Sequence, residues 1–110
     1  MRFKTMLLAV AAIGLAATEA LAAGACNWGG MRSIGSNDSR ELIVVNQVGD
    51  RSARLYWIDF QGRPKLYAEI PPYGRHVQQT YRGHVWVSEN SYGYCDVIFT
   101  VENNVEIVIK

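Results

Sequence analysis

The chain has 110 residues, of which 11 are Lys or Arg and 10 are Asp or Glu, giving a formal net charge of +1. This balance leaves no basic surplus that would attract nucleic acid or anionic lipid. We therefore expect no nucleic-acid partner. A chain of this length is typical of one domain with a modest apolar core.

The first 22 residues have the three parts of a secretory signal peptide. Arg2 and Lys4 give a basic start, residues 6–17 are an apolar run, and the Ala-Leu-Ala at 20–22 places the cut before Ala23. The apolar run is too short to span a bilayer. Cleavage removes two basic residues and one acidic residue, which leaves 88 residues with nine of each sign. The alanine-rich leader is typical of bacteria, so we expect an exported protein, periplasmic or secreted, without membrane contact after cleavage.

The two cysteines predict a crosslink. Cys26 and Cys95 are the only cysteines of the chain, and an exported chain matures in an oxidising compartment. A disulfide between them would close a loop of about 70 residues, worth about 4 kcal/mol in the chain-entropy model. The alternatives are a free thiol, a bond between two chains and half of a metal site, but no CxxC or Cys/His spacing supports metal. We expect an N-terminal loop over 23–39 tethered by Cys26, with no metal and no cofactor.

Residues 40–110 show short strand signals separated by turn residues, and we assign them to one domain. Strands are predicted at residues 42–46, 53–60 and 65–70, in a hairpin over about 75–88, and in a last hairpin of 96–101 with 105–109. The Pro-Pro-Tyr-Gly at 71–74 is a strong breaker, and no segment after the leader has capped helical periodicity. About seven short strands at this spacing predict an all-β fold, an antiparallel β-sandwich.

The predicted hairpin of residues 75–88 turns at residues 81–83. A three-residue loop with its glycine in the left-handed conformation fits better than a two-residue loop, because only Gly takes positive φ without strain. Thr80 and His84 would then face each other, with Gln78 and Trp86 on the same face. A hydroxyl, an imidazole and an indole would meet on one patch that suits a small polar ring or a peptide group. The alternative is that the tryptophan packs in the core and the histidine is half-exposed.

Two strings of residues carry a resemblance to a known family. They are Tyr56-Trp57-Ile58-Asp59-Phe60-Gln61-Gly62-Arg63-Pro64 and, after Tyr67 and Ile70-Pro71-Pro72, Thr80-Tyr81-Arg82-Gly83-His84-Val85-Trp86. Together they resemble the β domain of the von Hippel–Lindau tumour suppressor family, and residues 42–46 look like the first strand of that domain. The similarity runs from about Arg32 to Lys110. The combination of the two strings is specific, whereas neither string alone would be.

In that family the β domain is a sandwich whose surface pocket grips a hydroxylated proline of an extended substrate peptide. The resemblance implies that Thr80 and His84 hydrogen-bond the ring hydroxyl. It implies that Trp57 and Trp86 wall the ring and that Tyr67 contacts the proline carbonyl. The positions that match supporting roles are Asn46, Tyr81 and Gly83. A site that hydrogen-bonds a ligand hydroxyl rejects the analogue lacking it, because its own polar groups would go unpaired.

Several residues depart from the family pattern. Thr80 stands where the family has Ser, which keeps the hydroxyl but adds a methyl group. Gly35 and Asn37 fall where the family holds the peptide with Asn and Arg, and Gln79 replaces a His beside the pocket. The chain ends at Lys110 without the helical domain that recruits the ubiquitin-ligase adaptor. We therefore expect no adaptor partner and no ligase function.

These residues suggest three alternative functions. The first is an exported module that binds an extended peptide, with proline or hydroxyproline in the pocket. The second is a structural or stress-related sandwich in which the same residues serve only packing. The third is an enzyme, for which a nucleophile, a base and an orienting group must be identifiable together. His84 and Asp59 offer a pair, but Thr80 is a poor nucleophile and no oxyanion motif is visible, so we expect no enzyme.

Overall fold

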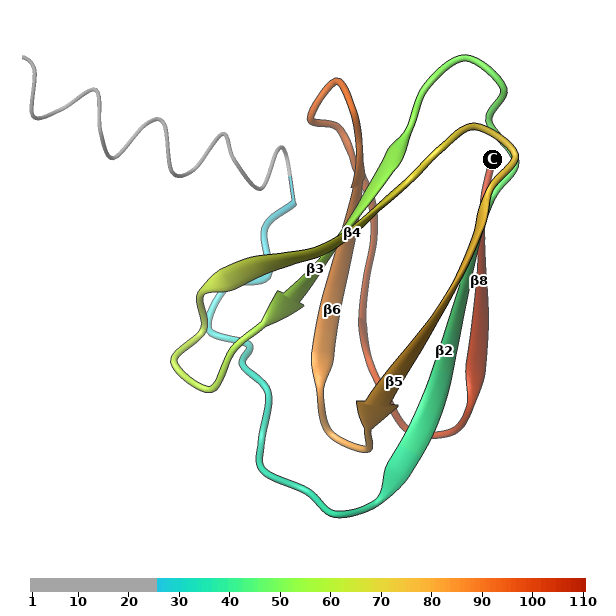
Figure 1. The fold of residues 1–110 in the computed structure, drawn as a ribbon. Coiled ribbons are helices and arrows are strands. Elements are labelled where there is room, and N and C mark those ends of the chain that lie inside the picture. Colours follow the sequence, from blue (N-terminus) through green and yellow to red (C-terminus); the bar gives the residue numbers. More distant parts are fainter. Residues whose placement is uncertain (1–25) are drawn as a thin grey trace, which may run out of the picture.

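The computed structural model describes residues 26–110; the predicted leader, its cut site and residues 23–25 lie outside this range. Within this range, seven strands form two sheets (Figure 1), one of three strands in the order β5-β2-β8 and one of four in the order β4-β3-β6-β7. The strands are β2 (Ser39–Asn46), β3 (Ala53–Ile58), β4 (Pro64–Ile70), β5 (Arg75–Tyr81), β6 (Val85–Asn90), β7 (Cys95–Thr100) and β8 (Val105–Ile109). The predicted all-β sandwich is confirmed.

The main core lies between the two sheets. Alternate side chains of β2, Leu42 and Val44, point inward and are fully buried, as the period of two along a strand requires. They meet Leu55 from β3 and Trp86 from β6. β6 is buried along its whole length because both of its faces are covered: Trp86 packs in the core between the sheets, and Val85 and Val87 pack in a second cluster on the opposite face.

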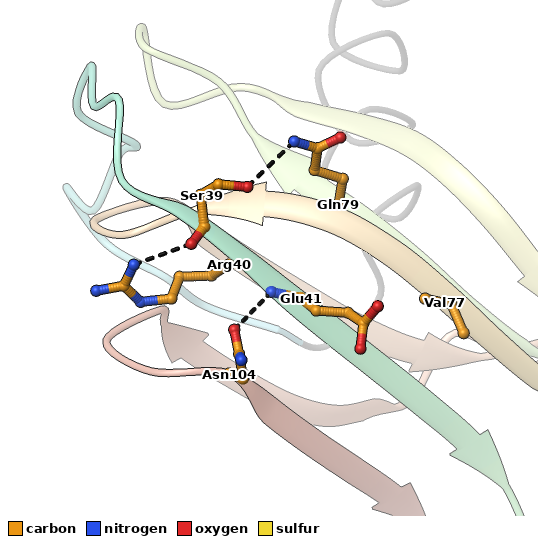
Figure 2. Close-up of a pocket in the computed structure, with 6 residues that line it drawn as sticks. All are labelled: Ser39, Arg40, Glu41, Val77, Gln79 and Asn104. Atoms are coloured by element: carbon orange, nitrogen blue, oxygen red, sulfur yellow. Dashed lines mark hydrogen bonds between the residues drawn. The ribbon is translucent and has the colours of Figure 1, made fainter.

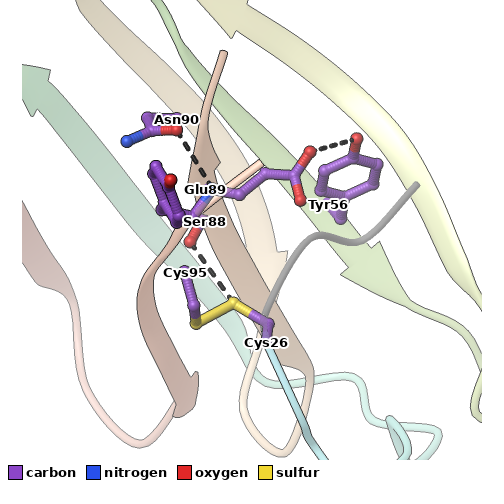
Figure 3. The surroundings of a disulfide bond; sticks show 7 residues. Cys26, Tyr56, Ser88, Glu89, Asn90 and Cys95 are labelled. Carbon is purple, nitrogen blue, oxygen red and sulfur yellow. Dashed lines mark hydrogen bonds between the residues drawn. A yellow bond between two sulfur atoms is a disulfide. The ribbon is translucent and has the colours of Figure 1, made fainter. Parts of the chain in front are cut away.

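A second apolar cluster lies on the outer face of the four-stranded sheet, beneath the N-terminal segment. It contains Tyr56 and Val87 from the sheet, with Cys26 and Trp28 packed against them. The predicted disulfide between Cys26 and Cys95 is present, with 4.7 Å between the Cα atoms and 69 residues of sequence separation (Figure 3). The Trp28 indole N–H also donates to the Gly62 carbonyl at 3.0 Å. The segment is therefore held by a covalent bond and a hydrogen bond.

The predicted hairpin of residues 75–88 is wrong. β5 and β6 belong to different sheets, and the turn between them is a corner of the sandwich. Thr80 therefore pairs with Arg40 on β2 and not with His84, and Gln78 pairs with Leu42 and does not share a face with Trp86. The turn was predicted correctly: Gly83 has φ of +89°, and the His84 N–H donates to the Tyr81 carbonyl at 3.1 Å.

The predicted last hairpin is wrong for the same reason. β7 is an edge of the four-stranded sheet, whereas β8 crosses to the other sheet and runs parallel to β2. The crossing is fixed next to the first corner, where the Val101 N–H donates to the His84 carbonyl at 2.9 Å and the Gly83 N–H donates to the Val101 carbonyl at 2.8 Å. Both local turns are compatible with a hairpin. The chain crosses between sheets because this buries the apolar side chains of β6 and β8 in the shared core.

Candidate functional site

Four aromatic side chains from separate elements meet at one side of the sandwich, and we call them the aromatic site: Trp57, Phe60, Tyr67 and His84. The Trp57 ring lies 5.2 Å from Phe60, 5.4 Å from His84 and 6.0 Å from Tyr67, measured between ring centroids. The Phe60 and His84 rings are 5.8 Å apart and nearly perpendicular. Such edge-to-face contacts are favourable between aromatic rings and fix their positions.

The turn after β3 places Phe60 at the aromatic site. Asp59 is buried, and its Oδ1 accepts the backbone N–H groups of Gln61 at 2.9 Å and Arg63 at 2.8 Å. The hydrogen bond from the Arg63 backbone lowers the pKa of Asp59 most, and the Arg63 guanidinium, 3.6 Å from Oδ2, adds to this. Gly62 supplies the positive φ of +86° that the turn needs. The Asp59 carboxylate therefore stabilises the turn that carries Phe60.

His84 is held as an acceptor inside the aromatic site. The Trp57 indole N–H donates to Nδ1 of His84 at 3.1 Å. An imidazole that accepts at Nδ1 carries its proton on Nε2, so Nε2 is the nitrogen left to donate. Burial lowers the pKa of His84, which favours the neutral ring at neutral pH. The site thus presents aromatic walls and one neutral imidazole.

Thr80 and Trp86 lie beneath the aromatic site. Their exposed fractions are 1% and 2%, and the Trp86 indole N–H donates to the Thr80 hydroxyl oxygen at 2.8 Å. Tyr67 covers Trp86, with ring centroids 5.2 Å apart, and is itself 48% exposed. The structure thus brings the five pocket residues expected from the resemblance into one connected cluster. Only three of them, Trp57, Tyr67 and His84, have accessible surface for a ligand.

Asn46, Tyr81 and Gly83, the expected supporting residues, each have a structural contact. Asn46 is buried at the end of β2, and its side-chain amide donates to the carbonyls of Arg51, Ile70 and Pro71 at 3.0–3.2 Å. The Tyr81 ring lies 5.4 Å from His84. A Cβ at Gly83 would come within 2.6 Å of the Ile34 side chain, in addition to the strain of its positive φ. The contacts of Tyr81 and Gly83 lie at the corner that carries His84, whereas Asn46 holds the connection between β4 and β5 at the other end of β5.

Two residues of the site were missed by reasoning from the sequence. Phe60 lies in the quoted string three residues after Trp57, a spacing that spans the end of β3 and the following turn. Lys65 on β4 lies opposite Trp57 in the strand register, with its ammonium 5.9 Å from the indole centroid. The register between β3 and β4 would have predicted Lys65 as a neighbour of Trp57.

A separate hollow of about 360 Å³ lies on the outer face of the three-stranded sheet (Figure 2). It shares no residue with the aromatic site; its lining residues are Ser39, Arg40, Glu41, Val77, Gln79 and Asn104. Its polar groups bond to one another: Gln79 donates to the Ser39 hydroxyl at 3.2 Å, and the Glu41 N–H donates to Asn104 at 2.9 Å. We assign no ligand to this hollow.

Within residues 26–110 no three His, Cys, Asp or Glu side chains gather closely enough to hold a metal ion. Over the same residues, no helix has the length and apolar character required to cross a bilayer. The disulfide is compatible with an oxidising, exported location.

The fold and the site define a small two-sheet β-sandwich with a partly exposed aromatic site where β3, β4 and the β5–β6 corner meet. A family model described as VHL beta domain matches residues 31–107. The chain therefore belongs to the VHL beta domain family. Its β domain is a substrate-binding domain, which is consistent with a protein or peptide partner for this chain.

Proposed function

We propose that the protein is an exported, non-enzymatic binding module that takes an extended, proline-containing peptide segment at the aromatic site, without ubiquitin-ligase function. The observation that supports this most is the partial exposure of Tyr67 and Phe60, at 48% and 44%, beside Trp57 and the neutral His84. Exposed aromatic rings clustered around one polar group are typical of a recognition site.

The chemistry suits a proline ring and its neighbouring peptide group. The apolar ring packs against the faces and edges of Trp57 and Tyr67, which removes apolar surface from water. Nε2 of His84 donates to a carbonyl or hydroxyl oxygen of the ligand. β5 is an edge strand of the three-stranded sheet and presents backbone groups to an added strand. An extended peptide therefore gains both side-chain and backbone contacts.

Recognition of a hydroxylated proline needs a further step in this chain. The Thr80 hydroxyl is buried and already accepts the Trp86 indole N–H. A ligand hydroxyl would bond to Thr80 only after Tyr67 moves from its place over Trp86. The second candidate function is a structural sandwich. The buried hydrogen bond between Trp86 and Thr80 favours it, because it pairs the indole N–H with the hydroxyl oxygen without any ligand.

An NMR titration of the oxidised protein tests the proposal. A proline-containing peptide and its hydroxyproline twin are each added while the indole N–H signal of Trp57 and the ring protons of His84 are followed. We expect saturable shifts at both residues. Tyr67→Ala removes an exposed wall and should weaken binding about tenfold, as for a contact near the centre of an interface.

Tyr92→Ala is the matched control, because Tyr92 is an exposed tyrosine on the β6–β7 loop at 65% exposure. It should leave binding unchanged. The absence of shifts with either peptide at millimolar concentration would contradict peptide binding and leave the structural function.

A further inference from the structure

The two segments that build the aromatic site, residues 57–67 and 80–86, carry more positive than negative side chains. Their charged residues are three cations, Arg63, Lys65 and Arg82, and one carboxylate, Asp59. The chain after the predicted leader has nine charges of each sign, so this surplus is local. A local surplus of positive charge attracts an anionic group at short range, because salt screens it beyond about 10 Å.

Two of the three cations already have a carboxylate partner. Nε of Arg63 lies 3.6 Å from Oδ2 of Asp59, and Nε of Arg82 lies 3.4 Å from Oε1 of Glu102. Lys65 forms no ion pair within residues 26–110. The backbone hydrogen bond from Arg63 lowers the pKa of Asp59 most and the charge of Lys65 lowers it least. Lys65 is therefore the cation of the aromatic site that is left for a ligand.

The local fold holds Lys65 at the wall of the aromatic site. It follows Pro64, whose ring fixes φ, and it pairs with Trp57 in the register of β3 and β4. The Asp59 N–H donates to the Arg63 carbonyl at 2.8 Å, which closes the turn between these strands. The Lys65 ammonium lies 5.9 Å from the centroid of the Trp57 ring. A group that packs against Trp57 therefore comes within reach of this ammonium.

The contact with the indole does not use the binding capacity of Lys65. An attraction between a cation and a ring acts within about 6 Å of the ring centroid and is weak at an exposed site. Lys65 is exposed. A contact with a ring face also leaves the three N–H donors of an ammonium free to bond to oxygen. The side chain is thus held toward the aromatic site and can still bind an anion.

We propose that the peptide bound at the aromatic site carries an Asp or Glu two residues from its proline, and that Lys65 binds this carboxylate. The inference rests on the proposed function and adds the charge of the ligand to it. Side chains of an extended peptide alternate, so residues two positions from the proline point to the same side as the proline ring. They lie about 7 Å away along the strand, a gap that the two long side chains span together. Residues one position away point to the opposite side.

The two polar groups of the aromatic site then select different features of the ligand. The neutral His84 donates from Nε2 to an uncharged oxygen, and the Lys65 ammonium pairs with a charged one. A basic residue two positions from the proline is repelled by Lys65, which adds to the discrimination between ligands.

The test compares three peptides that differ only two residues from the proline, where they carry Glu, Gln or Lys. One set has this position before the proline and a second set has it after, so that both directions of the added strand are covered. A further peptide of each set has Glu directly next to the proline. Affinities are measured from the shift of the Trp57 indole N–H signal in titrations of the oxidised protein.

We expect the Glu peptide of one set to bind the native protein about two- to fivefold more tightly than its Gln twin, as for a partly exposed ion pair. The peptide with Glu next to the proline should bind like the Gln twin. Raising the salt concentration from about 0.01 to about 1 M, which shortens the screening length from about 30 to about 3 Å, should remove the difference.

Lys65→Gln tests the residue itself. Lys110→Gln is the matched control, because Lys110 is exposed and is the only other lysine after the predicted leader. The preference for Glu should disappear in Lys65→Gln and remain in Lys110→Gln. In Lys65→Glu it should reverse, so that the Lys peptide binds most tightly. An unchanged Trp86 indole N–H signal in each free variant shows that the core is intact.

Equal binding of the Glu and Gln peptides to the native protein, with saturable shifts at Trp57, would overturn this inference and leave the proposed function standing. A preference for Glu that persists in Lys65→Gln would also overturn it, because another group would then bind the carboxylate. If none of the peptides shifts the Trp57 signal, the proposed function fails and the inference fails with it.

Discussion

Replacing Thr80 with valine tests whether its hydroxyl has a structural role. Valine has nearly the shape of threonine but cannot accept the Trp86 indole N–H, which now bonds to the hydroxyl oxygen at 2.8 Å. Both side chains are at most 2% exposed, so water cannot replace the lost acceptor. An unsatisfied buried donor costs about 1–3 kcal/mol. For a domain of this size that lowers the melting temperature by about 5–20 °C.

The assay is urea unfolding of the oxidised protein, followed by circular dichroism. Thr80→Ser is the control, because it keeps the acceptor and loses one buried methyl group, about 1 kcal/mol. Trp86→Phe removes the donor, and the double variant should be less destabilised than the sum of the two single variants by about 1 kcal/mol or more. Additive effects, or a loss in Thr80→Val no larger than in Thr80→Ser, would refute the role given to this hydrogen bond.

Three further predictions concern the disulfide and two titrating groups. Replacing both Cys26 and Cys95 with serine should lower the free energy of unfolding by about 4 kcal/mol, because the bond joins residues 69 apart in the sequence; a change under 1 kcal/mol in urea unfolding would contradict this. Burial, together with the Glu89 carboxylate, raises the pKa of Tyr56 to about 12; since the unfolded phenol ionises near pH 10, stability should fall as the pH rises from about 10 to 12, and Tyr56→Phe should remove that part of the fall in a base titration. Burial lowers the pKa of His84, so below about pH 6.5 the unfolded chain binds the proton more readily and stability should fall as the pH falls. The Trp57 indole N–H signal should then shift with the same midpoint as the His84 ring, because protonated Nδ1 no longer accepts; independent midpoints would show that the hydrogen bond is absent.

The strands were predictable because their signals are local. The alternation in β2 and the turn residues at 61–62 and 71–74 depend only on near neighbours in the sequence. The disulfide was predictable because only two cysteines are present. The pairing of strands was not predictable in this way. A type of turn such as that at residues 81–84 can join two paired strands or turn a corner between sheets, and the choice depends on which arrangement buries Trp86.

The candidate site was predictable as a set of residues but not as an arrangement. The resemblance named five residues that the structure joins through ring contacts and two hydrogen bonds. The burial of Thr80 could not be seen, because it follows from the packing of the two sheets against each other. Phe60 was missed because its contact with His84 joins two corners of the sandwich.

Peptide binding at the aromatic site is tested most directly by intermolecular nuclear Overhauser effects between a bound peptide and the protein. A peptide labelled at its proline ring is added to the oxidised protein until the chemical shifts no longer change. We expect cross-peaks from the proline ring protons to the Trp57 indole and the Tyr67 ring. A saturated complex in which those protons show cross-peaks only to residues outside the aromatic site would contradict it.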